Sequence, residues 1–172
     1  MSIRIGQPAP ELEGRALVNG DIKEFKLSDY RGKGWVVLFF YPEDFTFVCP
    51  TEIRGFNAHF ADFEKVGAKV IGASVDSVYS HKAWVQGDLG PVKFPLFADI
   101  TKDASRAYGV LNEEAGIAFR WTFIIDDKGV VRSYVVNDLG TGRSIDETLR
   151  TIQALQTGAN TPCDWKPGEK TL

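Results

Sequence analysis

Uninterrupted hydrophobic runs alternate with amphipathic segments along the chain. Residues 36–40 and 69–75 are apolar runs with several β-branched or aromatic members, a pattern typical of strands buried on both faces of a sheet. Between them, four apolar residues recur at three- and four-residue spacing, which predicts one apolar face of a helix that ends at Gly67. These four residues are Ile53, Phe56, Phe60 and Phe63.

The second half of the chain predicts a hairpin followed by a helix. Residues 122–125 and 130–136 have strand composition, and the Asp-Lys-Gly sequence at 127–129 supplies turn residues between them. Ser144 and Glu147 have the spacing of a capping box, which marks the start of the last helix. The other predicted elements are helices at 77–86 and 101–108 and a short extended segment at 94–98.

This order of elements predicts a three-layer α/β domain with a central mixed sheet. The pattern alone fits several folds of that class. The length of 172 residues suits one domain, which we place at residues 1–158. Residues 159–172 are polar and contain two prolines and a glycine, so we expect a C-terminal tail there.

Composition and charge exclude several classes of function. The chain is 44% hydrophobic and 25% charged, with a net charge of −3, and it has no basic stripe, so nucleic acid is not an expected partner. No apolar run approaches the roughly 18 residues that a membrane span requires. The first residues lack a charged-then-apolar signal pattern, so we expect a cytoplasmic location.

The few cysteines and histidines limit the possible cofactors. Two cysteines are too few for a disulfide scaffold, and in a reducing compartment such residues are catalytic, metal-binding or packed. His59 and His81 give no recognisable metal spacing with them. There is also no Gly-rich phosphate loop of known form. We therefore expect neither a metal nor a bound cofactor.

Cys49 stands between the first buried strand and the amphipathic helix. Pro50 suits the first helical position, where its missing N–H costs nothing, so Cys49 would lie at the helix start. Free backbone N–H groups and the positive end of the helix dipole favour a thiolate there, and the thiolate is the reactive form of cysteine. The alternative is that Cys49 is a small buried hydrophobic residue.

The same segment resembles a known active site. Pro42, Thr46 and Cys49 match the Pro-x-x-x-Thr-x-x-Cys motif of peroxiredoxins, and residues 44–52 are similar to the typical two-cysteine subfamily that includes the peroxidase component of alkyl hydroperoxide reductase. The resemblance implies a thioredoxin-like fold and covers nearly the whole chain. Further matching blocks, in the same order, lie at 76–84, 98–101, 123–126 and 142–150.

The resemblance also implies a role for each residue of the motif. Cys49 would be the peroxidatic cysteine. Thr46 would hydrogen-bond the thiolate and the incoming peroxide through its hydroxyl, and Pro42 would shield the site from water. We expect this enzyme to act on hydrogen peroxide and organic hydroperoxides.

Three charged residues match positions that support the peroxidatic cysteine in this family. Arg120 occupies the place of the active-site arginine, whose guanidinium cannot lose its proton and is therefore a fixed cation beside the sulfur. It would stabilise the thiolate and the charge that develops on the departing oxygen. Glu52 and Arg143 match positions that orient or support Arg120.

Cys163 lies 114 residues after Cys49 (163 minus 49), within the predicted tail. The sequence Trp-Lys-Pro-Gly at 165–168 matches the element that follows the resolving cysteine in typical two-cysteine peroxiredoxins. The commonest pattern has Cys-Pro four residues before the tryptophan, whereas here Cys163 stands two residues before Trp165. The resemblance implies that Cys163 resolves the oxidised cysteine of a neighbouring protomer, and the alternative is an inert exposed thiol.

Together these roles imply an antioxidant peroxidase cycle. Cys49 would become a sulfenic acid and then a disulfide with Cys163, which thioredoxin or a flavoprotein disulfide reductase would reduce. The resemblance implies a homodimer and a ring of five dimers. Two other functions stay open: a one-cysteine peroxidase in which Cys163 is idle, and a non-catalytic, ring-forming holdase or redox sensor.

Overall fold

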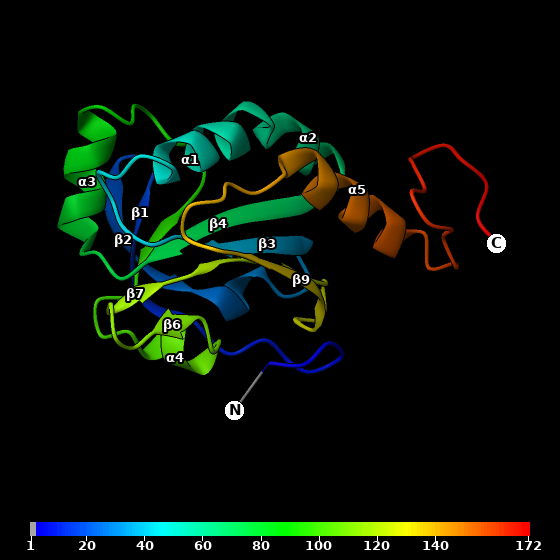
Figure 1. Cartoon of the computed structure of the whole chain (residues 1–172), viewed down its shortest axis with the longest axis horizontal. Helices are drawn as coiled ribbons and strands as arrows, with labels where there is room; N and C mark the ends of the chain where they lie inside the picture. Colours follow the sequence, from blue (N-terminus) through cyan, green and yellow to red (C-terminus); the bar gives the residue numbers. More distant parts are fainter. Residues whose placement is uncertain (1–2) are drawn as a thin grey trace.

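The computed structural model describes residues 3–172, which form a seven-stranded sheet between layers of helices (Figure 1). The strand order is β2-β1-β5-β4-β3-β8-β9, and β6 and β7 form a separate small ladder. The strands are β1 (Glu13–Val18), β2 (Asp21–Lys26), β3 (Trp35–Phe40), β4 (Ala68–Ser74), β5 (Leu96–Ala98), β6 (Leu111–Asn112), β7 (Ile117–Ala118), β8 (Arg120–Ile125) and β9 (Val131–Asn137).

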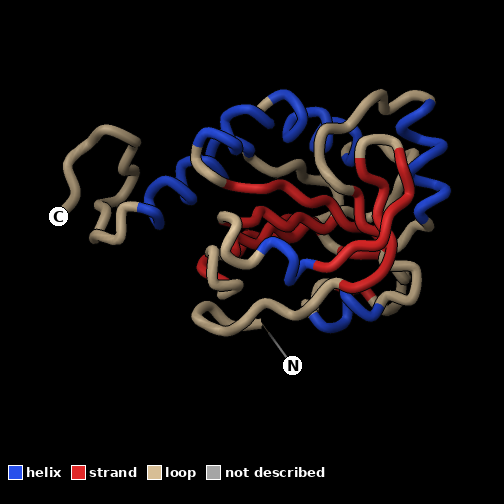
Figure 2. Tube along the Cα trace, turned by 180° about the vertical axis from the view of Figure 1, so that it is seen from behind, coloured by secondary structure: helices blue, strands red, loops and turns tan. Residues whose placement is uncertain are grey.

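The helices cover both faces of this sheet (Figures 1 and 2). Helices α1, α2, α3 and α5 share one core with one face, and α4 packs with the other. Their bounds are α1 (Cys49–Ala58), α2 (Phe60–Lys65), α3 (Val78–Gln86), α4 (Asp103–Ala107) and α5 (Ile145–Gln156), with a 3₁₀ turn at Leu27–Tyr30. The predicted three-layer α/β class is therefore confirmed.

Strand β3 is an interior strand of the sheet, between β4 and β8. It pairs in parallel with β4 and antiparallel with β8, so the sheet is mixed as predicted. Successive side chains of a strand point to opposite faces. Val36, Leu38 and Phe40 accordingly join one core, while Val37 and Phe39 join the other. An apolar run without alternation is thus explained, because both faces of β3 are covered.

The prediction of one continuous helix between the first two buried strands is wrong. The chain forms two helices, α1 and α2, which are separated at His59. His59 has φ −92° and ψ 11°, outside the helical region, and its ring Nδ1 lies 3.2 Å from the Asp62 carboxylate. The apolar periodicity continues across this break because Phe56 and Phe63 still pack in one cluster.

The last helix begins as its capping sequence predicts. The Ser144 side chain accepts a hydrogen bond from the Glu147 backbone N–H at 3.2 Å. The reciprocal bond of a capping box is absent among the described residues, because the Glu147 carboxylate binds Arg150 instead. After α5 the chain continues as the tail that projects beyond the helical layer (Figure 1). Within residues 3–172, no helix has the length and apolar character needed to cross a bilayer.

The buried aromatic residues of β3 are expected to carry much of the stability. Phe39 is fully buried and stacks on Phe56 with ring centroids 4.3 Å apart. Phe39→Ala is expected to lower the free energy of unfolding by about 3–5 kcal/mol, because it leaves a cavity beside the Phe56 ring. Urea denaturation measures this change.

Phe47 provides the matched control, because the same residue type is 95% exposed there. Phe47→Ala is expected to change the free energy of unfolding by less than about 0.5 kcal/mol. Equal losses in the two variants would contradict the assignment of Phe39 to the core.

Candidate active site

Cys49 is the first residue of α1, at the end of the loop that follows β3. Its side chain is fully buried. Pro50 occupies the first turn, and the N-cap residue Val48 contributes no side-chain cap. The backbone N–H groups of Thr51 and Glu52 donate to the Val48 carbonyl at 3.0 and 3.3 Å, so it is the positive end of the helix dipole, close to the sulfur, that favours a thiolate.

Arg120 brings a positive charge directly to this sulfur. It is the first residue of β8, the strand that pairs with β3, and it is only 4% exposed. Its Nη1 atom lies 3.4 Å from Cys49 Sγ and 2.8 Å from Glu52 Oε2. Its Nε donates to the Leu139 carbonyl at 2.8 Å. Contacts with Glu52 and with the Leu139 carbonyl thus hold the guanidinium against the sulfur.

Glu52 joins Arg120 to a second buried arginine. Arg143, in the loop before α5, donates to Glu52 through its backbone N–H at 3.1 Å and its Nε at 2.9 Å. The Arg143 guanidinium also donates to the carbonyls of Phe40 at 2.7 Å and Trp121 at 2.9 Å. Burial lowers the pKa of Arg143 and Glu52 opposes that shift, and an arginine stays protonated in any case. Glu52 therefore lies between two fixed cations.

The structure brings together four of the seven residues that the sequence singled out. Cys49, Glu52, Arg120 and Arg143 form one buried cluster, in which Glu52 binds both arginines and Arg120 reaches the sulfur. Two positive charges and one negative charge leave this cluster at +1 when the sulfur carries a proton. A Cys49 thiolate makes it neutral, so burial of the cluster favours the thiolate.

Thr46 and Pro42 lie on the loop that leads to Cys49. Pro42 is buried, as a residue that excludes water would be. The Thr46 hydroxyl donates to the Glu43 carbonyl at 3.0 Å, and among the described residues it makes no bond to the sulfur. A hydroxyl that donates its hydrogen to one acceptor can still accept a second hydrogen bond through its oxygen. The arrangement therefore suits Thr46 to accept a hydrogen bond from a substrate more than to donate one to Cys49.

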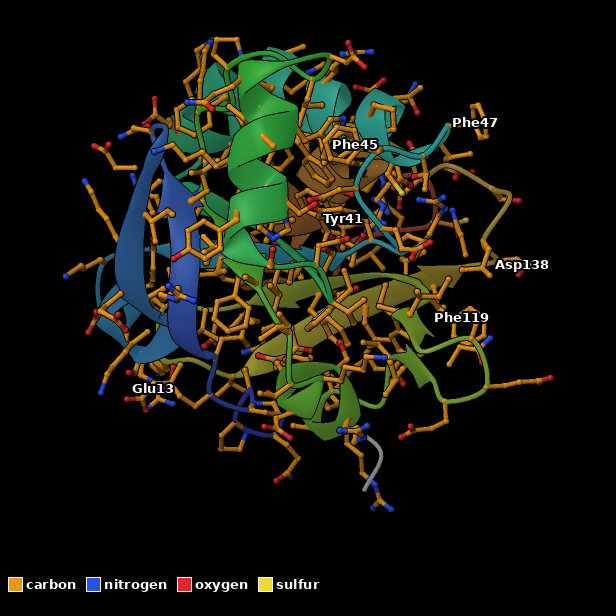
Figure 3. All side chains as sticks on the ribbon, turned by 90° about the vertical axis from the view of Figure 1, so that its left-hand side faces the viewer. Glu13, Tyr41, Phe45, Phe47, Phe119 and Asp138 are labelled. Atoms are coloured by element: carbon orange, nitrogen blue, oxygen red, sulfur yellow. The ribbon has the colours of Figure 1, made fainter. Side chains whose placement is uncertain are left out.

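A buried polar network that sequence reasoning missed fixes this loop. Asp44 accepts from the Tyr41 hydroxyl at 2.8 Å and lies 2.7 Å from His81 Nδ1. Burial, followed by the charge of Asp44, raises the pKa of Tyr41, which therefore stays a donor. Figure 3 shows Tyr41 pointing inward beneath the loop and Phe47 pointing outward. The sequence hides this network because His81 lies 40 residues after Tyr41 in the chain.

Cys163 lies apart from this cluster. It is exposed on the tail after α5, whereas Cys49 is buried, and both thiols are free. A disulfide requires Cα atoms within about 7 Å, so this conformation of one chain does not pair the two cysteines.

Comparison with known proteins agrees with this geometry. Residues 5–134 match the model of the AhpC/TSA family. The chain is 56% identical to Peroxiredoxin-2 of Rattus norvegicus over 177 residues, covering 98% of this chain and 89% of the relative. It is 51% identical to 2-Cys peroxiredoxin BAS1, chloroplastic, of Spinacia oleracea, covering 98% of this chain and 67% of that relative.

A solved structure gives the same result for the fold. The reduced 2-Cys peroxiredoxin of Plasmodium vivax superimposes with a TM-score of 0.94 at 37% sequence identity, covering 97% of this chain and 91% of that one. A buried thiol at a helix start beside a fixed cation, on a thioredoxin-like sheet, defines a thiol-based oxidoreductase. The chain belongs to the AhpC/TSA family, and it is a peroxiredoxin, an enzyme with thiol-dependent peroxidase activity.

The Arg120 contact predicts a loss of activity. Arg120→Ala is expected to slow peroxide reduction by about 100-fold or more, the usual effect of removing one donor to a developing negative charge. Arg120→Lys is expected to be intermediate, because an ammonium cannot reach Cys49, Glu52 and the Leu139 carbonyl together. Single-turnover peroxide consumption measures both variants.

Arg106→Ala is the control, since Arg106 is an exposed arginine of α4 that also binds a glutamate. It is expected to react at the wild-type rate. If Arg120→Ala consumed peroxide as fast as this control, the role of Arg120 beside the sulfur would be wrong.

Proposed function

We propose that the Cys49 thiolate attacks the peroxide and that Cys163 resolves the product as a disulfide. The nucleophilic role of Cys49 rests on the 3.4 Å contact between Arg120 Nη1 and its fully buried sulfur at the start of α1. That sulfur has both a helix N-terminus and a fixed cation beside it, which together favour the nucleophilic form.

The first step converts the thiolate to a sulfenic acid. The Cys49 sulfur bonds to one peroxide oxygen while the O–O bond breaks, and the second oxygen leaves with the bonding electrons. It takes up a proton and departs as water or as an alcohol. Arg120 donates to the oxygen on which charge develops, Thr46 accepts from the peroxide O–H, and Pro42 helps to exclude water.

The second step forms the disulfide and restores the enzyme. The Cys163 sulfur displaces the sulfenic hydroxyl of Cys49, so that an S–S bond forms, an S–O bond breaks and water leaves. Because Cys49 is fully buried and Cys163 exposed, the first turn of α1 has to open for the two to meet. An external dithiol, of thioredoxin or of a flavoprotein disulfide reductase, then reduces the disulfide by exchange.

Exposed apolar residues support a homodimer that assembles into a ring. Strand β9 is an edge of the sheet, and its residues Val135 and Val136 are 54% and 47% exposed, a combination that favours pairing with a second chain. Phe45, Tyr79 and Ile100 are also apolar and exposed, by 57%, 61% and 62%, and we assign them to a second contact surface. A ring of five dimers requires two different contacts of this kind.

We also propose a cytoplasmic location for this chain. The spinach relative carries the word chloroplastic in its name, so the location needs a direct test. Fractionation of the source cells, followed by detection of the native protein, provides that test, and recovery with an organelle would contradict the proposal.

Substitutions of the two cysteines are expected to block different steps of the reaction. Cys49→Ser is expected to lose peroxide consumption almost completely, because an uncharged hydroxyl is a poor nucleophile at neutral pH. Cys163→Ser is expected to keep the first turnover but to lose turnover with a dithiol protein as reductant. Stopped-flow peroxide consumption and non-reducing gels measure these two steps.

Covalent dimers on the gel are expected in the wild type after one equivalent of peroxide and in neither variant. Substantial peroxide reduction by Cys49→Ser would overturn the first assignment. Wild-type turnover by Cys163→Ser with the dithiol protein would instead leave Cys163 idle and support the one-cysteine alternative.

The two apolar surfaces predict separate assembly defects. Val135→Lys is expected to give monomers, because it places a charge in the β9 edge, whereas Tyr79→Lys is expected to give dimers but no ring. Analytical ultracentrifugation of the reduced protein measures the masses. Lys23→Glu, on the exposed strand β2, is the charge-changing control and is expected to leave the assembly intact. Unchanged masses in both test variants would contradict the two-surface assembly.

A further inference from the structure

The tail after α5 is a closed loop rather than a free strand of chain. The Leu172 N–H donates to the Asn160 carbonyl at 2.8 Å, which brings the two ends of the segment together. Trp165 is only 4% exposed, and its indole N–H donates to the Glu169 carbonyl at 3.0 Å. A segment of this length with joined ends and a buried side chain has the properties of an Ω-loop. We call residues 159–172 the C-terminal loop.

Cys163 stands on an exposed turn of the C-terminal loop. The backbone N–H of Trp165 donates to the Pro162 carbonyl at 3.2 Å, which closes the turn around Cys163. Asp164, the residue after the cysteine, has φ +57°, a left-handed conformation that aspartate adopts more readily than most residues. This turn therefore has a defined backbone and presents the thiol to solvent.

Arg150 ties this turn to the body of the enzyme. It lies in α5, and its Nη1 donates to the Trp165 carbonyl at 3.1 Å. The other side of its guanidinium is held by Glu147, at 2.6 Å from Nε and 2.7 Å from Nη2. The planar fork of an arginine allows both sets of bonds at once. Glu147 thus orients Arg150, and Arg150 in turn holds the backbone two residues after Cys163.

The charge of Arg150 also faces the cysteine turn. Arg150, Cys163 and Asp164 line one open groove with a volume of about 520 Å³. Glu147 chiefly raises the pKa of Arg150, and the charge of Asp164 adds to that shift. The contact with the turn is therefore electrostatic as well as directional.

We propose that Arg150 is a positioning residue for Cys163, which it serves by anchoring the C-terminal loop to α5. This inference rests on the resolving role proposed for Cys163. A turn that is already ordered loses less conformational entropy when its thiol meets the sulfenic acid. Arg150 does not touch the reacting atoms, so it acts on the disulfide step and leaves the attack on peroxide unchanged.

The two steps are separated by single-turnover kinetics on the reduced enzyme. Arg150→Gln is expected to form the Cys49 sulfenic acid at the wild-type rate and the disulfide about tenfold more slowly, a factor equivalent to about 1.4 kcal/mol. A slower disulfide step gives a second peroxide more time to react. Intact-mass spectrometry is therefore expected to show sulfinic acid, two oxygens heavier, at lower peroxide than in the wild type.

Two further variants keep the test specific. Arg106→Gln is the matched control, because Arg106 of α4 also binds a glutamate at 3.1 Å and a backbone carbonyl, that of Thr101, at 3.1 Å. It is expected to behave as wild type in both steps. Arg150→Lys keeps a cation that can donate to the Trp165 carbonyl but lacks the planar fork that binds Glu147 at the same time, so a partial rescue of the disulfide rate is expected.

The outcomes distinguish this inference from the proposed function. A wild-type disulfide rate in Arg150→Gln, or an equal slowing of both steps, would overturn the positioning role while Cys163 stays the resolving cysteine. Absence of any Cys49–Cys163 disulfide in the wild type would overturn the role of Cys163 and the role of Arg150 with it. Selective slowing of the disulfide step, with rescue by lysine, supports the proposal.

Discussion

The proposed active site depends on one buried cluster of charges. Arg120 and Arg143 share the carboxylate of Glu52, and their combined charge is balanced only when Cys49 is a thiolate. A net charge buried away from water costs several kcal/mol even after the surroundings relax. The buried cluster therefore stabilises the ionised form of Cys49, because the thiolate balances the remaining positive charge of the two arginines.

The sheet supplies the fixed points that hold this cluster. The carbonyl of Phe40 at the end of β3 and the carbonyl of Trp121 in β8 both accept from Arg143, and Leu139 accepts from Arg120. Backbone carbonyls of paired strands cannot turn away, so the Arg143 guanidinium is placed before any substrate arrives. Arg120 is itself a residue of β8, and its acceptor Leu139 lies in the turn just after β9. Preorganised donors of this kind need no rearrangement when charge develops on the departing oxygen.

The sequence predicted the parts of this arrangement that depend on local pattern. The apolar run of β3 and the cysteine before Pro50 were sufficient to place a strand, a loop and a helix start. The hairpin of β1 and β2 was missed, although Asn19 and Gly20, with φ of +51° and +83°, are the strongest short-range hairpin signal. The ion pair between Glu52 and Arg143 joins residues 91 positions apart, and only the tertiary fold determines such a contact.

The same cluster also explains how one site can perform two opposed tasks. A buried sulfur at a helix start is well placed for attack on peroxide and badly placed for a disulfide with an exposed thiol. Oxidation changes the balance, because a sulfenic acid carries no charge when protonated and the two arginines then face Glu52 alone. The electrostatic stabilisation of the first turn of α1 falls at that moment. Local opening requires the least free energy when the stabilising interactions of a segment are weakest. In the proposed cycle, the chemistry of the first step thus prepares the opening that the second step needs.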